Sequence, residues 1–151
     1  MRIGIGNDHI GFPLKLALAE HLATAGHTVV DFGHDGTDRV DYPVYALRVA
    51  EAVVEGTVDR GLVICGTGVG VSIAANKVTG VRCVCCSEPY SAAMSRLHND
   101  TNMIAIGSRV LGEGAAFGVV DSWLATEFEG GRHTDRVAQL SAIEARQRRR
   151  S

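Results

Sequence analysis

The sequence has few aromatic residues, no large excess of charge of one sign and no hydrophobic run of membrane-spanning length. Aromatic residues make up 5% of the 151 residues, so the stacking surfaces that bind nucleic-acid bases are not expected. The net charge of −2 provides no attraction to nucleic acid or to an anionic membrane. Residues 1–5 begin a strand where a signal peptide would need a longer apolar segment, so we expect a cytoplasmic protein.

The four cysteines lack the spacing of a metal site or a disulfide framework. Cys83, Cys85 and Cys86 lie in one apolar, strand-like run, while Cys65 stands alone. Cys83 and Cys86 have CxxC spacing, but the sequence has no second such pair and no histidine cluster near these cysteines. We therefore expect no metal, and we interpret the cysteines as small, buried, hydrophobic residues in a reducing compartment.

Two nucleotide-binding motifs are also missing. The pattern Gly66-x-Gly68-x-Gly70 differs from GxGxxG, and Lys77 lies too far along the chain to complete a GxxxxGK[ST] motif. A dinucleotide or nucleoside triphosphate is therefore not expected, and the sequence predicts no cofactor.

Short apolar runs alternate with helical segments along nearly the whole chain. This alternation is typical of βαβ units, and unbroken apolar runs indicate parallel strands buried on both faces. We predict an α/β fold with a single doubly wound, Rossmann-like domain over residues 1–146, in which a five-stranded parallel sheet is flanked by helices. The expected strands lie near residues 2–6, 27–32, 61–65, 81–86 and 102–107.

Helices are expected between these strands and at the end of the chain. They lie near residues 12–25, 43–55, 71–77, 89–98, 112–125 and 133–146. Residues 147–151 are basic, with nothing apolar to bury, and are expected to form a disordered tail.

The stretch from Leu62 to Lys77 joins a strand to a helix through three glycines in five residues. This layout directs several unpaired backbone N–H groups at one point above the sheet edge. Such a nest binds an anion or stabilises a developing oxyanion. Cys65 is the last strand residue, at the lip of the nest. A tight turn with a buried structural cysteine explains the same residues equally well.

In doubly wound folds, ligands bind beyond the carboxyl ends of the strands. Asp8 and His9 come directly after the first strand, where they suit hydrogen bonds to a polyol or a phosphate, although Asp8 could instead cap the next helix. His98 and Asn99 precede the fifth strand and therefore belong to the opposite edge. We expect them to act in the site of a neighbouring subunit, which is a geometric reason to expect a dimer.

Two further groups of residues have a functional and a structural interpretation. His98 lies near a helix C-terminus, where the helix dipole favours the protonated form of a general acid, or it is part of a helix-ending loop. Arg132 and Arg136 are four residues apart on one helix face, which suits a phosphate or a solvated surface. Arg109, after the fifth strand, could join these arginines in an assembled site.

Six segments together resemble the ribose-5-phosphate isomerase B and galactose-6-phosphate isomerase family of sugar-phosphate isomerases. The resemblance covers Met1 to about Glu144 and implies a metal-free aldose–ketose interconversion through a cis-enediolate. It also implies a site shared between two subunits of a homodimer, with a tetramer as the alternative assembly. The segments are GNDHIGF, VDYPVYA, LVICGTGVGVSIAANK, CSEPYSAAMSRLHNDTN, IAIGSRV and FEGGRHTDRV.

The resemblance also implies a role for each candidate residue. One subgroup of the family uses the cysteine before the glycines as its base, and the other carries a glutamate just after them. Cys65 and Val71 occupy these positions here, which indicates the cysteine subgroup. Cys65, Thr67 and His98 are then catalytic, and the partner's His98 assists ring opening. The implied substrate-binding residues are Asp8, His9, Gly66, Gly68, Val69, Gly70, Asn99, Arg109, Arg132 and Arg136.

The expected reaction interconverts ribose 5-phosphate and ribulose 5-phosphate. The same chemistry on a tetrose or hexose phosphate (erythrulose 4-phosphate, allose 6-phosphate or galactose 6-phosphate) stays open, because substrate length depends on the distance from the nest to the arginines. A non-catalytic module that binds sugar phosphates is the alternative from a different class. Neither a nucleic acid nor a membrane is expected as a partner.

Overall fold

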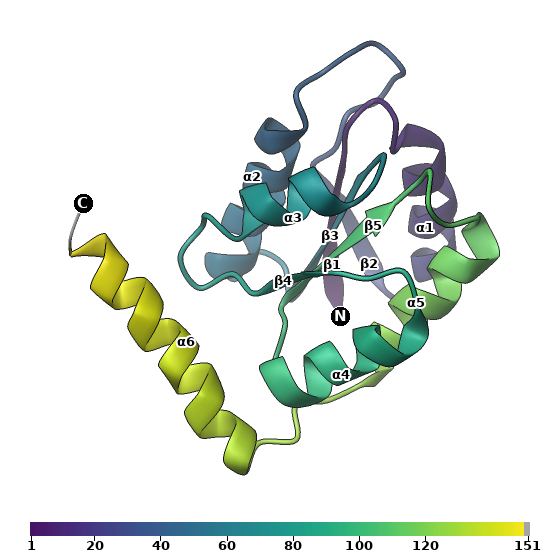
Figure 1. The fold of residues 1–151 in the computed structure, drawn as a ribbon. Coiled ribbons are helices and arrows are strands. Elements are labelled where there is room, and N and C mark those ends of the chain that lie inside the picture. The colour runs from purple at the N-terminus through teal and green to yellow at the C-terminus, as the bar shows by residue number, and fades with distance from the viewer. Residues whose placement is uncertain (150–151) are drawn as a thin grey trace.

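The computed structural model describes residues 1–149, which form a parallel sheet with helices on both faces (Figure 1). The five strands have the order β2-β1-β3-β5-β4. They are β1 (Arg2–Asn7), β2 (Thr28–Asp31), β3 (Arg60–Cys65), β4 (Cys83–Cys85) and β5 (Met103–Gly107). The helices are α1 (Phe12–Thr24), α2 (Tyr42–Val54), α3 (Val69–Ala75), α4 (Pro89–Asn99), α5 (Glu113–Ala125) and α6 (Arg132–Arg148). The predicted doubly wound α/β fold is confirmed.

Most differences from the predicted elements lie at their ends. Strand β4 is shorter than predicted, and α3 begins at Val69, where the glycine turn ends. The predicted basic tail, residues 147–151, begins inside α6, because that helix continues to Arg148. The last two residues of the predicted tail lie outside the described residues.

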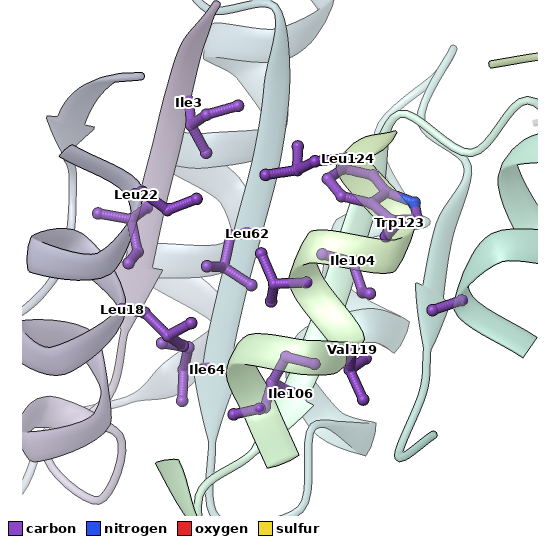
Figure 2. Close-up of a cluster of buried hydrophobic side chains, with 14 of the residues drawn as sticks. Ile3, Leu18, Leu22, Leu62, Ile64, Ile104, Ile106, Val119, Trp123 and Leu124 are labelled. Carbon is purple, nitrogen blue, oxygen red and sulfur yellow. The ribbon is translucent and has the colours of Figure 1, made fainter. Parts of the chain in front are cut away.

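Helices α1 and α5 cover one face of the sheet, and α2 and α3 cover the other. Leu14, Leu18 and Leu22 recur every four residues, so they lie along one face of α1, and all three are buried against the strands. Figure 2 shows Leu18 and Leu22 in this cluster together with Ile3, Leu62, Ile64, Ile104, Ile106, Val119, Trp123 and Leu124.

The parallel register brings the carboxyl ends of β3 and β5 together. Cys65 pairs with Gly107, and the chain after Cys65 crosses directly over the end of β5. A Cβ atom on Gly107 would lie 2.7 Å from the carbonyl oxygen of Thr67. Only glycine lets the two loops approach this closely, so Gly107 sets how near the turn after β3 lies to the end of β5.

Helix α6 extends away from the rest of the molecule (Figure 1). Among its described residues, His133 is buried, whereas the apolar side chains of Leu140 and Ile143 are about half exposed, at 46% and 53%. Within residues 1–149, no helix combines the length and hydrophobicity that a membrane span needs.

The loop after β2 is held by a buried lysine of α1. Lys15 Nζ donates to Asp31 Oδ2 at 2.8 Å, to Asp35 Oδ1 at 2.7 Å and to the His34 carbonyl at 3.1 Å. Burial acts to lower the pKa of Lys15, but the hydrogen bonds to the two carboxylates outweigh burial and raise it. Lys15 therefore stays charged and ties this loop to the core.

Replacing Lys15 with alanine tests this anchor. Lys15→Ala removes three hydrogen bonds, two of them to carboxylates, so we expect a loss of about 2–3 kcal/mol in the free energy of unfolding. Urea denaturation measures this loss. Lys77→Ala, at an exposed lysine, is the control and should change stability by less than about 0.5 kcal/mol. Equal stability of the two variants would contradict the anchoring role.

Candidate active site

The turn between β3 and α3 forms a nest around the sulfur of Cys65. Gly68 adopts a left-handed conformation (φ 79°), which points its backbone N–H back toward the end of the strand. This N–H donates to Cys65 Sγ at 3.2 Å. A side chain at Gly68 would be strained by its φ angle, and its Cβ would lie 2.9 Å from Cys85 Sγ. The local geometry therefore depends on glycine here.

The hydrogen bond places a backbone N–H donor directly against the Cys65 sulfur. Cys65 is buried, with 6% of its surface exposed. Thr67, two residues further along the turn, is exposed, and its hydroxyl oxygen accepts a hydrogen bond from the Val69 N–H at 3.3 Å. A thiol, a backbone donor and a hydroxyl thus share one small segment.

Asp8 and His9 lie at the same edge of the sheet as the nest. The Asp8 backbone N–H donates to the Ile64 carbonyl at 3.2 Å, which ties the end of β1 to the end of β3. Asp8 Oδ1 accepts from the backbone N–H groups of Ile10 and Gly11, so this oxygen caps the turn into α1. His9 Nδ1 accepts from the Val40 N–H at 3.3 Å.

Arg109 flanks the nest from the end of β5. Its backbone N–H donates to the Gly66 carbonyl at 3.0 Å, and its side chain lies against Gly66, with Cδ 3.6 Å from the position of a Cβ there. The guanidinium of this exposed residue is the cation that the chain itself places beside the nest. We call the assembly of Asp8, His9, Cys65 to Gly70 and Arg109 the nest group.

The remaining predicted site residues gather elsewhere, near the start of β5. His98 lies at the end of α4, and its ring stacks on the ring of His133 with centroids 4.2 Å apart and an interplanar angle of 14°. Arg132 Nε lies 3.4 Å from His133 Nε2. Together with Asn99 and Arg136, these residues form what we call the histidine group.

The nest group lies at the carboxyl ends of the parallel strands, and the histidine group lies at their amino ends. Cys65 ends β3 and pairs with Gly107, whereas His98 precedes Met103, the first residue of β5. The four residue steps from Met103 to Gly107 alone span about 13 Å along the strands. Arg109 belongs to the nest group, so within one chain it does not join Arg132 and Arg136.

Two residues near His98, Glu129 and His133, were not predicted from the sequence as site residues. Glu129 Oε2 lies 3.4 Å from His133 Nε2, and His133 is 4% exposed. Burial, followed by the positive charges of neighbouring side chains, lowers the pKa of His133. The spacing of four residues between Glu129 and His133 could have indicated that their side chains meet. The two glycines between them gave no reason to expect a helix there, so the pair was not predicted. We include both in the histidine group.

Cys65 and Cys86 are buried as predicted, whereas Cys83 is only partly buried. Cys85 is exposed rather than buried, because β4 is an edge strand, and its sulfur lies 3.7 Å from the Thr67 carbonyl oxygen. Burial raises the pKa of the Cys83 thiol and raises that of Cys86 to about 11. All four cysteines are free thiols.

Comparisons with known proteins identify the family of this chain. Residues 3–140 match the model of the family described as Ribose/Galactose Isomerase. The chain is 55% identical to ribose-5-phosphate isomerase B of Escherichia coli (strain K12) over 145 residues, covering 96% of this chain and 97% of that protein. The chain belongs to the ribose/galactose isomerase family. This membership confirms the resemblance drawn from the sequence, and with it the expectation of an isomerase.

Other relatives show the range of the family. A D-erythrulose-4-phosphate isomerase from Pectobacterium atrosepticum is 38% identical, with 95% of each chain covered. The structure of ribose-5-phosphate isomerase B from Clostridium thermocellum superposes with a TM-score of 0.96 at 53% identity, covering 97% of this chain and 99% of that one. The enzyme from Mycoplasma genitalium, solved with bound ribulose-5-phosphate, gives 0.91 at 39% identity, covering 95% and 96%.

The raised thiol pKa values predict selective alkylation. At pH 8, a thiol with a pKa of about 11 is ionised in about one molecule in a thousand, so iodoacetamide should leave Cys83 and Cys86 unmodified in the folded protein. Both should react once the protein is denatured. Peptide mass spectrometry after timed alkylation measures each site, and rapid labelling of Cys86 in the folded protein would contradict the inferred environment.

Proposed function

We propose that this chain interconverts ribose 5-phosphate and ribulose 5-phosphate, with Cys65 as the base. The observation that carries the proposal is the hydrogen bond from the Gly68 N–H to Cys65 Sγ, which places the sulfur inside the glycine nest. Ribose-5-phosphate isomerase B of Escherichia coli, at 55% identity, supports a pentose phosphate as the substrate.

In the proposed reaction, the Cys65 thiolate removes the proton from C2 of the open-chain aldose. The electrons of that C–H bond form a C1–C2 double bond, and charge develops on the oxygens of the resulting cis-enediolate. Backbone N–H groups of residues 66–70 stabilise these oxygens, and a donor of this kind typically contributes about 3–4 kcal/mol. The Thr67 hydroxyl exchanges a proton between the two oxygens. Cys65 then returns its proton to C1, which leaves the ketose.

The substrate would be held by the polar residues around the nest. His9 and Asp8 lie at the same sheet edge and bind the sugar hydroxyls in this proposal. Arg109 lies beside Gly66 and binds the phosphate, as do Arg132 and Arg136 of a second chain. Val71 is buried behind the turn and has no group that could accept a proton, which leaves Cys65 as the base.

We further propose that the active site is shared between the two chains of a homodimer. The nest group and the histidine group lie at opposite sheet edges, so the partner's His98 would have to reach the nest of the first chain. Two features offer apolar surface for a second copy. One is the exposed side chains of Leu140 and Ile143 on the projecting helix α6, and the other is a hollow of about 370 Å³ between α4, β4 and α6.

A tetrose phosphate is the second candidate substrate, because a relative named D-erythrulose-4-phosphate isomerase shares 38% identity. The identity to this relative is lower than the 55% to the Escherichia coli ribose-5-phosphate isomerase B, which favours the pentose. The ribulose-5-phosphate bound in the Mycoplasma genitalium enzyme favours it too. Comparing kcat/KM for ribose, allose, galactose and erythrulose phosphates separates these substrates, and absence of turnover with all four would indicate a binding module.

Replacing Cys65 tests the proposed base. Cys65→Ala should lower kcat by about 10²–10⁴-fold, because a general base contributes that much, while KM changes little. Cys85→Ser is the matched control, since Cys85 lies beside the same nest and has no role in the proposed chemistry. Full activity of Cys65→Ala in a coupled isomerase assay would rule out the mechanism.

The role of His98 is tested by comparing the two directions of the reaction. Ribose 5-phosphate is mostly a closed ring, formed through its free C4 hydroxyl. Ribulose 5-phosphate stays open, because its ring would have to close through the C5 oxygen, which carries the phosphate. His98→Asn should therefore lower kcat/KM by about 10²-fold or more with ribose 5-phosphate when ring opening is assisted by the enzyme. The initial conversion of ribulose 5-phosphate to the open-chain aldose, trapped chemically, should be nearly unchanged. Equal losses in both assays would exclude a role in ring opening.

A further inference from the structure

The histidine group contains three potential metal ligands that no motif in the sequence indicates. One ligand atom from each of His98, Glu129 and His133 lies within 4.8 Å of the other two. We propose that these three residues form a binding site for a divalent transition-metal ion of the zinc class. The consequence of binding rests on the proposed role of His98, because a bound ion would occupy this histidine and inhibit ring opening.

The chemistry of the three side chains suits zinc. Two imidazoles and one carboxylate are a ligand set that zinc uses in proteins, with the fourth position open to water. Ligand atoms around a tetrahedral zinc ion lie about 3.3 Å apart. The Glu129 Oε2 to His133 Nε2 distance of 3.4 Å already matches this spacing.

His98 must turn to complete the site. Its ring stacks nearly parallel to the ring of His133, so the lone pairs of the two rings point side by side rather than at one point. His98 is half-buried and lies at the end of α4, and Glu129 is 55% exposed at its side chain, so both have room to adjust. His133, the buried ligand, stays in place.

Hydrogen bonds hold the three segments together without fixing the ligand atoms. The Glu129 backbone N–H donates to the Leu97 carbonyl at 3.0 Å, which ties the loop after α5 to the last turn of α4. The His133 backbone N–H donates to the Gly130 carbonyl and closes the turn into α6. The ligands therefore come from a preformed cluster, and binding an ion requires side-chain rotation only.

Arg132 opposes the ion directly, and the positive charge of Arg136 also acts on His133. The Nε of Arg132 lies 3.4 Å from His133 Nε2, and its positive charge repels a cation. Arg132 is exposed, so its side chain can move into solvent when the ion takes its place at His133. The charge of Glu129 offsets part of this repulsion.

Zinc binding to the tag-free protein tests the proposal. Isothermal titration with Zn²⁺ alone should show one site per chain in the wild type, and Glu129→Gln should weaken it about tenfold or more, because mutating a residue that only hydrogen-bonds to a metal ligand already lowers metal affinity 10–100-fold. Glu127→Gln is the matched control, since Glu127 is a carboxylate two residues earlier in the same loop, outside the cluster. Equal zinc affinity of both variants, or no binding to the wild type, would overturn the site.

Two further readouts separate this site from the cysteines and from catalysis. Bound Co²⁺ should lack the thiolate charge-transfer band that a cysteine site would give, and the appearance of that band would contradict the assignment. Zinc should inhibit turnover of ribose 5-phosphate, with EDTA restoring activity, and Glu129→Gln should lose the inhibition when its activity with zinc is compared with its own activity in EDTA. Binding without inhibition would support the site and contradict the role of His98.

His133→Gln gives a second test of the ligand set. His133 is buried, so this variant is compared with the wild type for its circular dichroism spectrum before titration. A folded His133→Gln protein should lose zinc binding in the same way as Glu129→Gln. Retention of zinc binding by both variants would exclude the proposed ligands.

Discussion

The direction of β5 is the constraint on which the arrangement of this molecule depends. In a parallel sheet, the residues directly after each strand lie at one edge, and the residues directly before each strand lie at the other. Cys65 ends β3, so it lies at the carboxyl edge, whereas His98 precedes β5 and lies at the opposite edge. A chain that folds in this way cannot bring Cys65 and its own His98 together. The chemistry proposed here therefore requires a second chain.

At the carboxyl ends of the strands, the position of the Cys65 sulfur depends on backbone geometry. Gly68 has the φ angle that turns its N–H toward Cys65, and Gly107 allows the turn to lie directly on the end of β5. The sulfur is thus placed by two residues that have no side chain. In the proposed reaction these donors are fixed before the substrate arrives, so charge that develops there is stabilised with little reorganisation. Substituting either glycine would disturb the site without touching a catalytic group.

Much of this arrangement could be predicted from the sequence, because it depends on local signals. The apolar runs of β3 and β5 and the spacing of Leu14, Leu18 and Leu22 predict buried strands and a helix face. The opposite positions of Cys65 and His98 result from chain order alone.

The contacts that the sequence did not predict are those that depend on how distant segments pack. The stacking of His98 on His133 joins the end of α4 to the start of α6. Glu129 lies beside these histidines because its backbone N–H donates to the Leu97 carbonyl, and no side-chain pattern predicts such a backbone hydrogen bond. The exposure of Cys85 depends on the place of β4 at the sheet edge, and this strand order is decided by the whole topology.

Subunit complementation is the most direct test of the shared site. Cys65→Ala and His98→Asn, each nearly inactive on ribose 5-phosphate alone, are unfolded, mixed in equal amounts and refolded together. A heterodimer then contains one site with both Cys65 and His98, and the mixture should recover up to about a quarter of wild-type activity by two-fold symmetry. A mixture no more active than its separate components, although its chains have exchanged, would contradict a site built from two chains.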